Sequence, residues 1–472
     1  MVFEEEVVSE PASPSSQYLN SSVLSLYIIA VLEFEIPIFD DSLTMSLLKD
    51  VFLPINPRFS SIMVGEKNGA KKWRRVEVNL QDHVKVPIFP PATSPESYDE
   101  YLDDYLSEIT MDQLPQSRPL WEIHIIKYPT SNAAGNIIFK LHHALGDGFS
   151  LMGALLSCLQ RADDPSLPLT FPSRQSNTKL EGDCDNIFWR LPRIFSGVIN
   201  TVFDFGWSIL KSSLVEDDRT PIRSGGDGME FKPIVITTMT FSLDRIKQIK
   251  ANLKVTINDV LVGIIFYGTR LYMQTTSQDE VSNSQSTALV LLNTRAIGGY
   301  KSVDEMVRTD TDKTWGNQFA FLQVPIPTLA NSEQPDPLNF VLTAHQLIKR
   351  KRNSAAVHLI GRLLETLRKL KGPEATAGYI HSTLRNSSMG ISNLIGPVER
   401  MALANHPIKG LYFNVAGAPQ SLSVTILSYT GTLRVSIGME KGFMDPQKFK
   451  SCIENAFEMM FKAAVPCASP AN

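Results

Sequence analysis

The sequence predicts an α/β protein with two domains. Strand-like and helix-like segments alternate in both halves of the chain, which is typical of sheets covered by helices. The chain has 472 residues, and at roughly 150 residues per domain this length indicates two or three domains. No short internal repeat is visible, which argues against a solenoid or a propeller. We expect a first domain at residues 1–180, a linker at 181–230 and a second domain at 231–472.

In the first domain, hydrophobic periodicity separates strands from helices. Residues 31–36 alternate apolar and charged side chains, as a half-buried strand does. From Leu43 the apolar positions recur at helical spacing, and Ser94 followed by Pro95 is a typical helix start. The predicted strands of this half are 31–36, 120–128 and 136–141, and helices are predicted from Leu43, from Ser94 and from Gly148 to 159.

The second domain repeats this alternation. Thr430-Gly431 between two strand-like runs predicts a turn, and Asp445-Pro446 predicts the start of the last helix. The predicted helices are 243–253, one from Thr256, one from about Leu338 and one from Asp445; the predicted strands are 235–241, 289–292, 318–325, 388–393, 411–414, 422–429 and 432–439.

Composition and charge exclude several classes of protein. A content of 43% hydrophobic and 20% charged residues is that of a globular chain. The 45 basic and 49 acidic residues give a net charge of -4, so we expect no nucleic-acid partner. The four cysteines are scattered, which indicates a reducing compartment and no zinc site. The first residues lack a secretory or mitochondrial signal, so we expect the cytosol or the cytosolic face of a membrane.

The expected linker contains an amphipathic helix at about 187–211. Apolar residues are spaced three and four apart from Phe188 to Ile209, and Thr201, Asp204 and Ser208 line the opposite stripe. A spanning helix is disfavoured because Asp204 would cost roughly 2.5–3.5 kcal/mol at the centre of a bilayer. A helix that lies in the membrane interface, or that docks on the protein itself, fits the pattern better.

The segment from Leu141 to Gly148 carries the most chemistry. Strand alternation places His142 and His143 on opposite faces, with His143 on the apolar side. Desolvation there disfavours the imidazolium and keeps the ring neutral, so His143 is a plausible general base. Asp147 lies between two glycines, which predicts a tight turn that the carboxylate holds in place.

The segment from Leu141 to Gly148 fits a metal site or a serine hydrolase poorly. A metal site needs a third protein ligand, and no His or Cys cluster supplies one. A serine hydrolase needs a G-x-S-x-G elbow, and the nearest string, from Gly148 to Gly153, is one residue too long. From spacing alone, a purely structural role for both histidines is equally consistent.

His142-His143-x-x-x-Asp147-Gly148 resembles the HHxxxDG signature of CoA-dependent acyltransferases, whose fold is shared with chloramphenicol acetyltransferase and peptide-synthetase condensation domains. Further strings occur in the order seen in the plant-type wax ester synthase/diacylglycerol acyltransferases. These are Glu10-Pro11-x-Ser13-Pro14, Arg58-Phe59, Pro119-Leu120-Trp121, Asn258-Asp259, Asn293-x-Arg295, Trp315-Gly316-Asn317 and Ser392-Asn393-x-x-Gly396-Pro397. The resemblance implies a two-domain chloramphenicol-acetyltransferase-like fold with an active-site channel at the domain interface.

The resemblance also implies roles for single residues. His143 would be the general base that takes a proton from an alcohol as its oxygen attacks a fatty acyl-CoA thioester, without an acyl-enzyme. His142, Asp147 and Gly148 would support the motif, and Arg295 would pair with Asp147. Acyl-CoA would be a co-substrate, and no other cofactor and no metal are expected.

The remaining motif residues have a binding and a structural interpretation. Asn258, Asn317, Ser392 and Asn393 would bind substrate or stabilise the fold. Asp259 follows Thr256 at the spacing of a capping box, which is the pattern of a residue that stabilises a helix start. Ala320 stands where the family usually has glycine, which affects the shape of the acceptor channel. The basic run 349–352 is either a solvated helix end or a contact for lipid headgroups or CoA phosphates.

The function implied is transfer of a long-chain acyl group from acyl-CoA to a fatty alcohol, to diacylglycerol, or to both. The expected partners are fatty acyl-CoA, these acceptors and a membrane surface, with the cytosolic face of the endoplasmic reticulum as the expected location and the plasma membrane as a second one. The alternatives are an acyltransferase of the same fold that uses a soluble alcohol or amine, and a non-catalytic lipid-binding relative.

Overall fold

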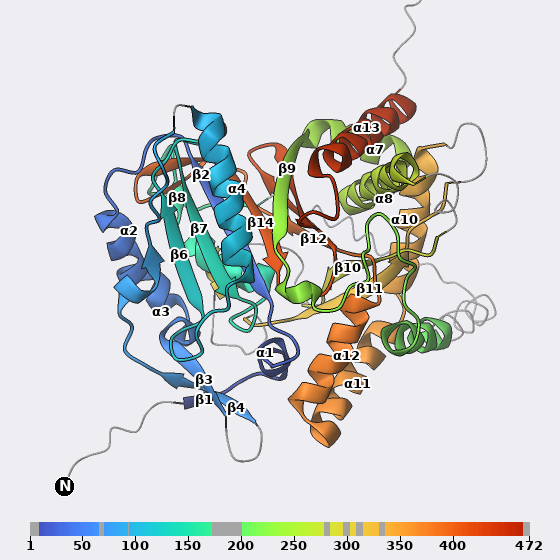
Figure 1. The fold of residues 1–472 in the computed structure, drawn as a ribbon, viewed down its shortest axis with the longest axis horizontal. Coiled ribbons are helices and arrows are strands. Elements are labelled where there is room, and N and C mark those ends of the chain that lie inside the picture. Colours follow the sequence, from blue (N-terminus) through green and yellow to red (C-terminus); the bar gives the residue numbers. More distant parts are fainter. Residues whose placement is uncertain are drawn as a thin grey trace, which may run out of the picture.

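The computed structural model describes residues 9–65, 70–92, 94–171, 201–277, 284–295, 303–307, 315–329 and 336–465. Two β-sheets lie side by side, and helices cover their outer faces (Figure 1). The hydrophobic core has one large cluster for each sheet and a smaller third cluster between them and helix α12 (Pro373–Arg385). The mixed α/β class predicted for both halves is therefore present.

The first sheet has seven strands and draws on both halves of the chain. β2 lies in its middle and pairs antiparallel with β7 on one side and β14 on the other. The order is β5 (Val84–Lys85), β6 (Trp121–Ile126), β7 (Gly135–His142), β2 (Tyr27–Phe34), β14 (His406–Ala416), β13 (Met401–Leu403) and β8 (Gln160–Arg161). Two strands of the C-terminal half, β13 and β14, thus complete the N-terminal sheet. The domain boundaries expected from the sequence stay a prediction.

Strand β2 begins and ends earlier than the predicted strand 31–36. All eight of its residues are buried because sheet partners and helices surround it. A strand buried on both faces reads as a continuous apolar run and not as an alternation. The prediction followed the alternation and was wrong at both ends: the strand starts at Tyr27, and Ile36 lies beyond it, 45% exposed.

Helices of the first half begin close to the predicted residues. α4 (Pro95–Met111) has proline at its first turn and buries Leu102, Leu106 and Ile109 against the sheet. α5 (Gly148–Ser157) is apolar and almost wholly buried. The helix predicted from Leu43 is broken into α2 (Ser42–Leu47), the π-turn η1 (Leu48–Phe52) and α3 (Leu53–Ile55). This half also contains α1 (Pro14–Leu19). A small three-stranded sheet has the order β1 (Ser9–Pro11), β4 (Lys71–Arg75) and β3 (Ser61–Gly65).

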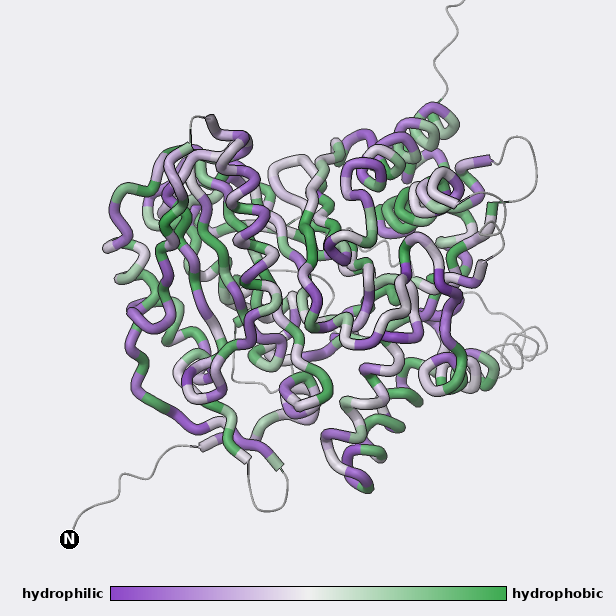
Figure 2. The backbone as a smooth tube through the Cα atoms, in the orientation of Figure 1, coloured by the Kyte–Doolittle hydropathy of each residue, from purple (hydrophilic) through white to green (hydrophobic). Residues whose placement is uncertain are grey.

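The second sheet has six strands, in the order β11 (Phe319–Pro325), β10 (Thr287–Asn293), β12 (Met389–Ile395), β15 (Leu422–Tyr429), β16 (Thr432–Glu440) and β9 (Ile234–Ser242). Its outer face is covered by α7 (Leu243–Leu253), α8 (Ile257–Thr276), α10 (Leu338–Arg352) and α13 (Pro446–Ala464), which lie together in Figure 1. The hydropathy colouring is green through buried α8 and mixed along α13 (Figure 2). The predicted bounds of α7 and β15 are confirmed.

Besides the short helices α1 and α9 (Val303–Val307), two long helices were not predicted. α11 (Ala356–Lys371) and α12 are joined at Gly372, whose positive φ of 86° suits glycine. They form a hairpin below the second sheet (Figure 1). Only Ala356 of α11 is fully buried, although the helix carries leucine and isoleucine at regular spacing. The apolar side of α11 therefore does not rest on a packed core.

The described part of the predicted linker helix exposes apolar side chains and buries polar ones. Residues 172–200 lie outside the described residues, and 201–213 are helical. Asp204 is 5% exposed and forms ion pairs with Arg350 at 3.1 Å and Lys351 at 3.4 Å. Val202 and Phe203 are 67% and 63% exposed. Within the described residues, no helix combines the length and the apolar character that a bilayer span requires.

Candidate active site

His142 holds the turn that follows β7. Its Nδ1 accepts a hydrogen bond from the backbone N–H of Ala144 at 3.0 Å, so in the neutral ring the proton is on Nε2, which lies 3.0 Å from Ser25 Oγ. Ser25 Oγ in turn donates to the hydroxyl of Tyr27 at 2.9 Å. Burial lowers the pKa of His142 to about 3, which keeps the ring neutral. Both ring nitrogens are thus engaged, and His142 positions the backbone next to His143.

His143 is buried, and its ring is held by Asn317 from the other half of the chain. The Asn317 amide nitrogen donates to the carbonyl oxygen of His143 at 2.8 Å, so the amide oxygen is the atom 2.8 Å from Nδ1. An amide oxygen only accepts, so Nδ1 carries the proton and Nε2 has a free lone pair. Burial lowers the pKa of His143, and the Asp147 carboxylate partly opposes this. This is the tautomer and charge state that a general base needs.

Asp147 is fully occupied by structural contacts. Its carboxylate binds Arg295 in a bidentate ion pair, at 2.6 and 3.0 Å, and both side chains are buried. It also accepts the backbone N–H of Ser150 at 3.1 Å, which caps α5, and that of Gln318 at 2.9 Å. The predicted pair Asp147–Arg295 is confirmed, and it joins the loop after β7 to the segment that carries Asn317.

Gly148 allows the two halves to approach each other closely. A Cβ atom at this position would lie 2.9 Å from Cδ1 of Leu394 on β12. The same strand carries Ser392 and Asn393, and the Asn393 amide donates to Asn258 Oδ1 at 3.4 Å. The lack of a side chain at Gly148 therefore places β12 next to the histidine loop.

Asp259 has the structural role that the capping-box pattern predicts. Its carboxylate accepts the Thr256 N–H at 2.9 Å, and Thr256 Oγ1 accepts the Asp259 N–H at 3.2 Å. His345 Nδ1 lies 2.8 Å from the same carboxylate. These contacts support the interpretation of Asp259 as the residue that stabilises the start of α8.

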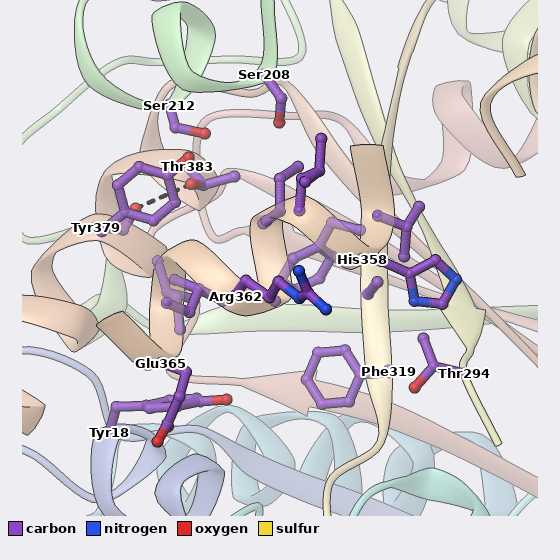
Figure 3. A pocket seen from close by; sticks show the side chains of 18 of the residues that line it. Tyr18, Ser208, Ser212, Thr294, Phe319, His358, Arg362, Glu365, Tyr379 and Thr383 are labelled. Carbon is purple, nitrogen blue, oxygen red and sulfur yellow. Dashed lines mark hydrogen bonds between the residues drawn. The ribbon is translucent and has the colours of Figure 1, made fainter. Parts of the chain in front are cut away.

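A cavity of about 890 Å³ is lined by two residues that contact His143, although His143 itself is not on its wall. It reaches Asn317 and Phe319, whose ring centroid is 5.4 Å from that of His143. Figure 3 shows it between β11, α11 and α12. Ala320, predicted to affect the acceptor channel, lines it; among the predicted site residues, Asn317 is the one on its wall. Most of the wall is apolar, with Leu19, Leu26, Phe319, Ala320, Phe321, Val357, Leu359, Ile360, Leu364 and Ile380.

Most residues of this cavity wall were not predicted from the sequence. α11 contributes a face from Val357 to Lys369, and α1 contributes Tyr18 and Leu19. Apolar residues at Val357, Ile360 and Leu364 have helical spacing and would have indicated an amphipathic helix. Within the described residues, no three side chains of His, Cys, Asp or Glu are grouped closely enough to hold a metal ion.

Comparisons with known proteins agree with this arrangement. The family model "Wax ester synthase/diacylglycerol acyltransferase catalytic domain" matches residues 51–261, and "WS/DGAT C-terminal domain" matches 315–461. Wax ester synthase/diacylglycerol acyltransferases 7 and 6 of Arabidopsis thaliana are both 30% identical to this chain; the matches cover 96% and 98% of it and 97% and 95% of the relatives.

Solved structures show the fold. The wax ester synthase/diacylglycerol acyltransferase from Marinobacter aquaeolei VT8 is 15% identical with a TM-score of 0.59, and the match covers 96% of this chain and 99% of that one. A variant of the starter condensation domain of rhizomide synthetase in complex with C8-CoA is 10% identical with a TM-score of 0.54, over 98% and 95% of the two chains. The predicted fold class is confirmed.

Proposed function

Since this chain belongs to the wax ester synthase/diacylglycerol acyltransferase family and is an acyltransferase, we propose that His143 is its general base. The reaction is transfer of a long-chain acyl group from acyl-CoA to a fatty alcohol or diacylglycerol. The observation that carries the proposal is the pair of 2.8 Å contacts between Asn317 and His143 at the start of an apolar cavity. These contacts support a neutral ring with Nε2 free.

The chemical step needs a single proton carrier. His143 Nε2 takes the proton of the acceptor hydroxyl while the oxygen forms a bond to the thioester carbonyl carbon. The tetrahedral intermediate then breaks its C–S bond, and the CoA thiolate leaves and is reprotonated by the imidazolium. A thiol pKa of roughly 8.5 makes this thiolate a good leaving group. A base positioned in this way contributes on the order of 10²–10⁴-fold to the rate.

The other predicted site residues position this base. Asn317 orients the ring, Asp147 and Arg295 hold the loop, and His142 fixes the turn. Asn258, Asp259, Ser392 and Asn393 belong to the packing of α8 against β12 in this proposal. Acyl-CoA is the co-substrate, and the residues of the site supply acid–base chemistry without a further cofactor.

The cavity supports long apolar substrates. Its volume of about 890 Å³ is at the upper end of the usual range of ligand sites, and its wall is mainly aliphatic and aromatic. An acceptor of this kind is dissolved in membranes. The exposed apolar face of helix 201–213 supports attachment to a membrane surface. We place this attachment on the cytosolic face of the endoplasmic reticulum, as the family resemblance suggests.

The test uses membranes from cells that lack neutral-lipid synthesis. Labelled palmitoyl-CoA is supplied with hexadecanol and diacylglycerol in competition, and the wild type is compared with His143→Ala. The control is His406→Ala, which changes a partly exposed histidine on β14 that is not on the cavity wall. We expect ester from the wild type and the control, and a loss of at least about 100-fold in His143→Ala.

The outcomes separate the alternatives. Equal activity of the wild type and His143→Ala would contradict the general base. Ester formation from a soluble alcohol without membranes would favour the acyltransferase with a soluble acceptor. Saturable binding of acyl-CoA without any product would favour the non-catalytic lipid-binding relative.

A further inference from the structure

The cavity beside His143 has a second polar region at its far end. Residues Asn317, Phe319, Phe321 and Gln323, which are every second residue of β11 and of the two residues before it, line it together with Ala320. The order along the wall is therefore polar, aromatic, aromatic, polar. At about 3.3 Å per residue, Gln323 lies about 20 Å from Asn317. Figure 3 shows Ser212, Tyr379 and Thr383 together on one side of the view and Phe319 and Thr294 on the other.

Gln323 has an acceptor atom that the protein does not use. Its side chain is only 5% exposed, and its amide nitrogen donates to Ser212 Oγ at 3.2 Å. Within the part of the chain that the structure describes, the amide oxygen is buried and has no hydrogen-bond partner. Ser212 and Tyr379 line the same cavity and lie together in Figure 3. Gln323 also lines a second, smaller cavity of about 390 Å³ together with Phe203 and Trp207. A buried amide oxygen without a donor is unfavourable, so a cavity lined by Gln323 is suited to a ligand that supplies one, and the larger cavity is the one that also holds Asn317.

The polar groups of the substrates that lie close to the reacting carbon would not reach the end of the cavity at Gln323. The ester groups of diacylglycerol are neighbours of its reacting hydroxyl, whereas Gln323 is about 20 Å away. The amides of the CoA arm follow the thioester closely and would lie beside Phe319 and Phe321, which offer no hydrogen bonds. A hydrocarbon chain suits these two rings. The hydrocarbon part of one leaflet is about 15 Å thick, so a long extended chain spans most of the about 20 Å along β11 and its far end lies near the polar region.

We propose that the chain bound in this cavity carries a hydroxyl group at its far end, and that Gln323, with Ser212 and Tyr379, selects it. This inference rests on the proposed acyl transfer and names its substrate class: hydrocarbon chains oxygenated at the end remote from the reacting group. The hydroxyl donates to Gln323 Oε1 and replaces the missing partner. A chain that ends in a methyl group leaves this oxygen unpaired. The hydroxylated chain is either the acceptor, as an α,ω-diol, or the acyl group, as an ω-hydroxyacyl-CoA.

The experiment compares matched substrates with the full-length protein in its membrane fraction. The acceptor arm uses hexadecanol against α,ω-hexadecanediol with palmitoyl-CoA, and the rate for the diol is divided by two because it has two equivalent ends. The donor arm uses palmitoyl-CoA against ω-hydroxypalmitoyl-CoA with hexadecanol. We expect kcat/KM to favour the hydroxylated member of one arm by about tenfold. The arm that shows the preference identifies the chain in the cavity.

Three variants test the residues. Gln323→Leu keeps a side chain of similar volume and is expected to remove the preference while hexadecanol is still esterified with palmitoyl-CoA. Tyr379→Phe removes one hydroxyl without a change of shape and is expected to reduce the preference. Tyr101→Phe, on α4 and away from the cavity, is the control and is expected to keep it.

The outcomes distinguish this inference from the proposed function. Ester formation from hexadecanol and palmitoyl-CoA with no preference in either arm overturns the inference and leaves the acyl transfer intact. A preference that survives in both Gln323→Leu and Tyr379→Phe also overturns it. Absence of ester from every substrate pair overturns the proposed function and this inference together. If Gln323→Leu does not fold, Tyr379→Phe decides the question.

Discussion

The side-chain amide of Asn317 bridges the ring and the backbone of His143, with a distance of 2.8 Å at each contact. The two residues are 174 positions apart in the chain and belong to different halves. The backbone contact fixes which amide atom faces the ring, so the tautomer of His143 follows from the position of Asn317. Orientation of the His143 ring, the proposed base, is thus a property of the interface between the two halves.

We expect Asn317→Ala to lower kcat by about 100-fold with little change in the KM for acyl-CoA, because the ring loses its orientation and the Nε2–H tautomer becomes accessible. In Asn317→Asp the Oδ acceptor is retained, but its charge stabilises the imidazolium and moves the acid limb of the pH profile to higher pH. Steady-state kinetics over a pH range measures both effects. Thermal unfolding of each variant is the control, and unchanged kcat in a folded Asn317→Ala protein would contradict the role.

The pH dependence of the wild type follows from the buried state of His143. Burial lowers the pKa of this histidine below its ordinary value near 6.5, and the neutral ring is the active form in the proposed mechanism. As the pH falls, the neutral fraction is lost only when the pH passes the lowered pKa. We therefore expect log kcat/KM to stay level through pH 6.5 and to fall at lower pH. An acid limb centred at or above 6.5 would contradict a buried, neutral base.

A second histidine makes the stability of the fold sensitive to acid. His124 on β6 is buried, and burial lowers its pKa to about 3, assisted by Lys85 and Lys140. The unfolded chain takes up this proton near pH 6.5 while the folded protein does not, so the free energy of unfolding decreases as the pH falls from 6.5 towards 3. At about 1.4 kcal/mol per pH unit, this histidine accounts for about 2 kcal/mol between pH 7 and pH 5.

The variant His124→Gln removes this linkage. We expect its free energy of unfolding to change between pH 7 and pH 5 by about 2 kcal/mol less than that of the wild type. Urea denaturation at both pH values measures the change. His358→Gln, at an exposed position of α11, serves as the control and is expected to behave like the wild type. An equal pH response of His124→Gln and the wild type would show that His124 takes up its proton over the same pH range in the folded protein as in the unfolded chain, and would contradict the lowered pKa.

Local motifs were predictable from the sequence, whereas contacts between distant segments were not. His143, Asp147 and Gly148 lie in one turn, so a short string identifies them. The Asp147–Arg295 pair was predicted through the family resemblance and not from spacing. The contact of Asn317 with His143 depends on how the two halves pack against each other. The spacing of apolar and polar residues along the chain does not indicate this packing.

Three structural misses have physical causes. β2 is buried on both faces, so the alternation rule placed it four residues too late at its start. α11 lines a cavity instead of a core, and no motif near it marks this role in the sequence. The third, the joining of β13 and β14 to the first sheet, is a choice of partner strand that local sequence does not encode.

The helix at residues 201–213 provides the last prediction, because its polar side faces the protein. Asp204 and Lys211 are buried in ion pairs, Asp204 with Arg350 and Lys351 and Lys211 with Asp217, while Val202, Phe203 and Trp207 are exposed. An exposed apolar stripe on a docked helix is suited to the interface of a bilayer. We expect Phe203→Ser/Trp207→Ser to reduce binding to phosphatidylcholine vesicles by about tenfold or more, since two aromatic side chains leave the interface.

Co-sedimentation with neutral vesicles measures this binding, and high salt should change it little because the stripe has no charge. The matched control is Phe231→Ser, which removes a phenylalanine that is 60% exposed outside this helix. Loss of binding in the double variant with retention in the control would assign attachment to this face. Equal loss in both would indicate a general effect of exposed aromatic residues, and full binding of the double variant would contradict attachment through residues 201–213.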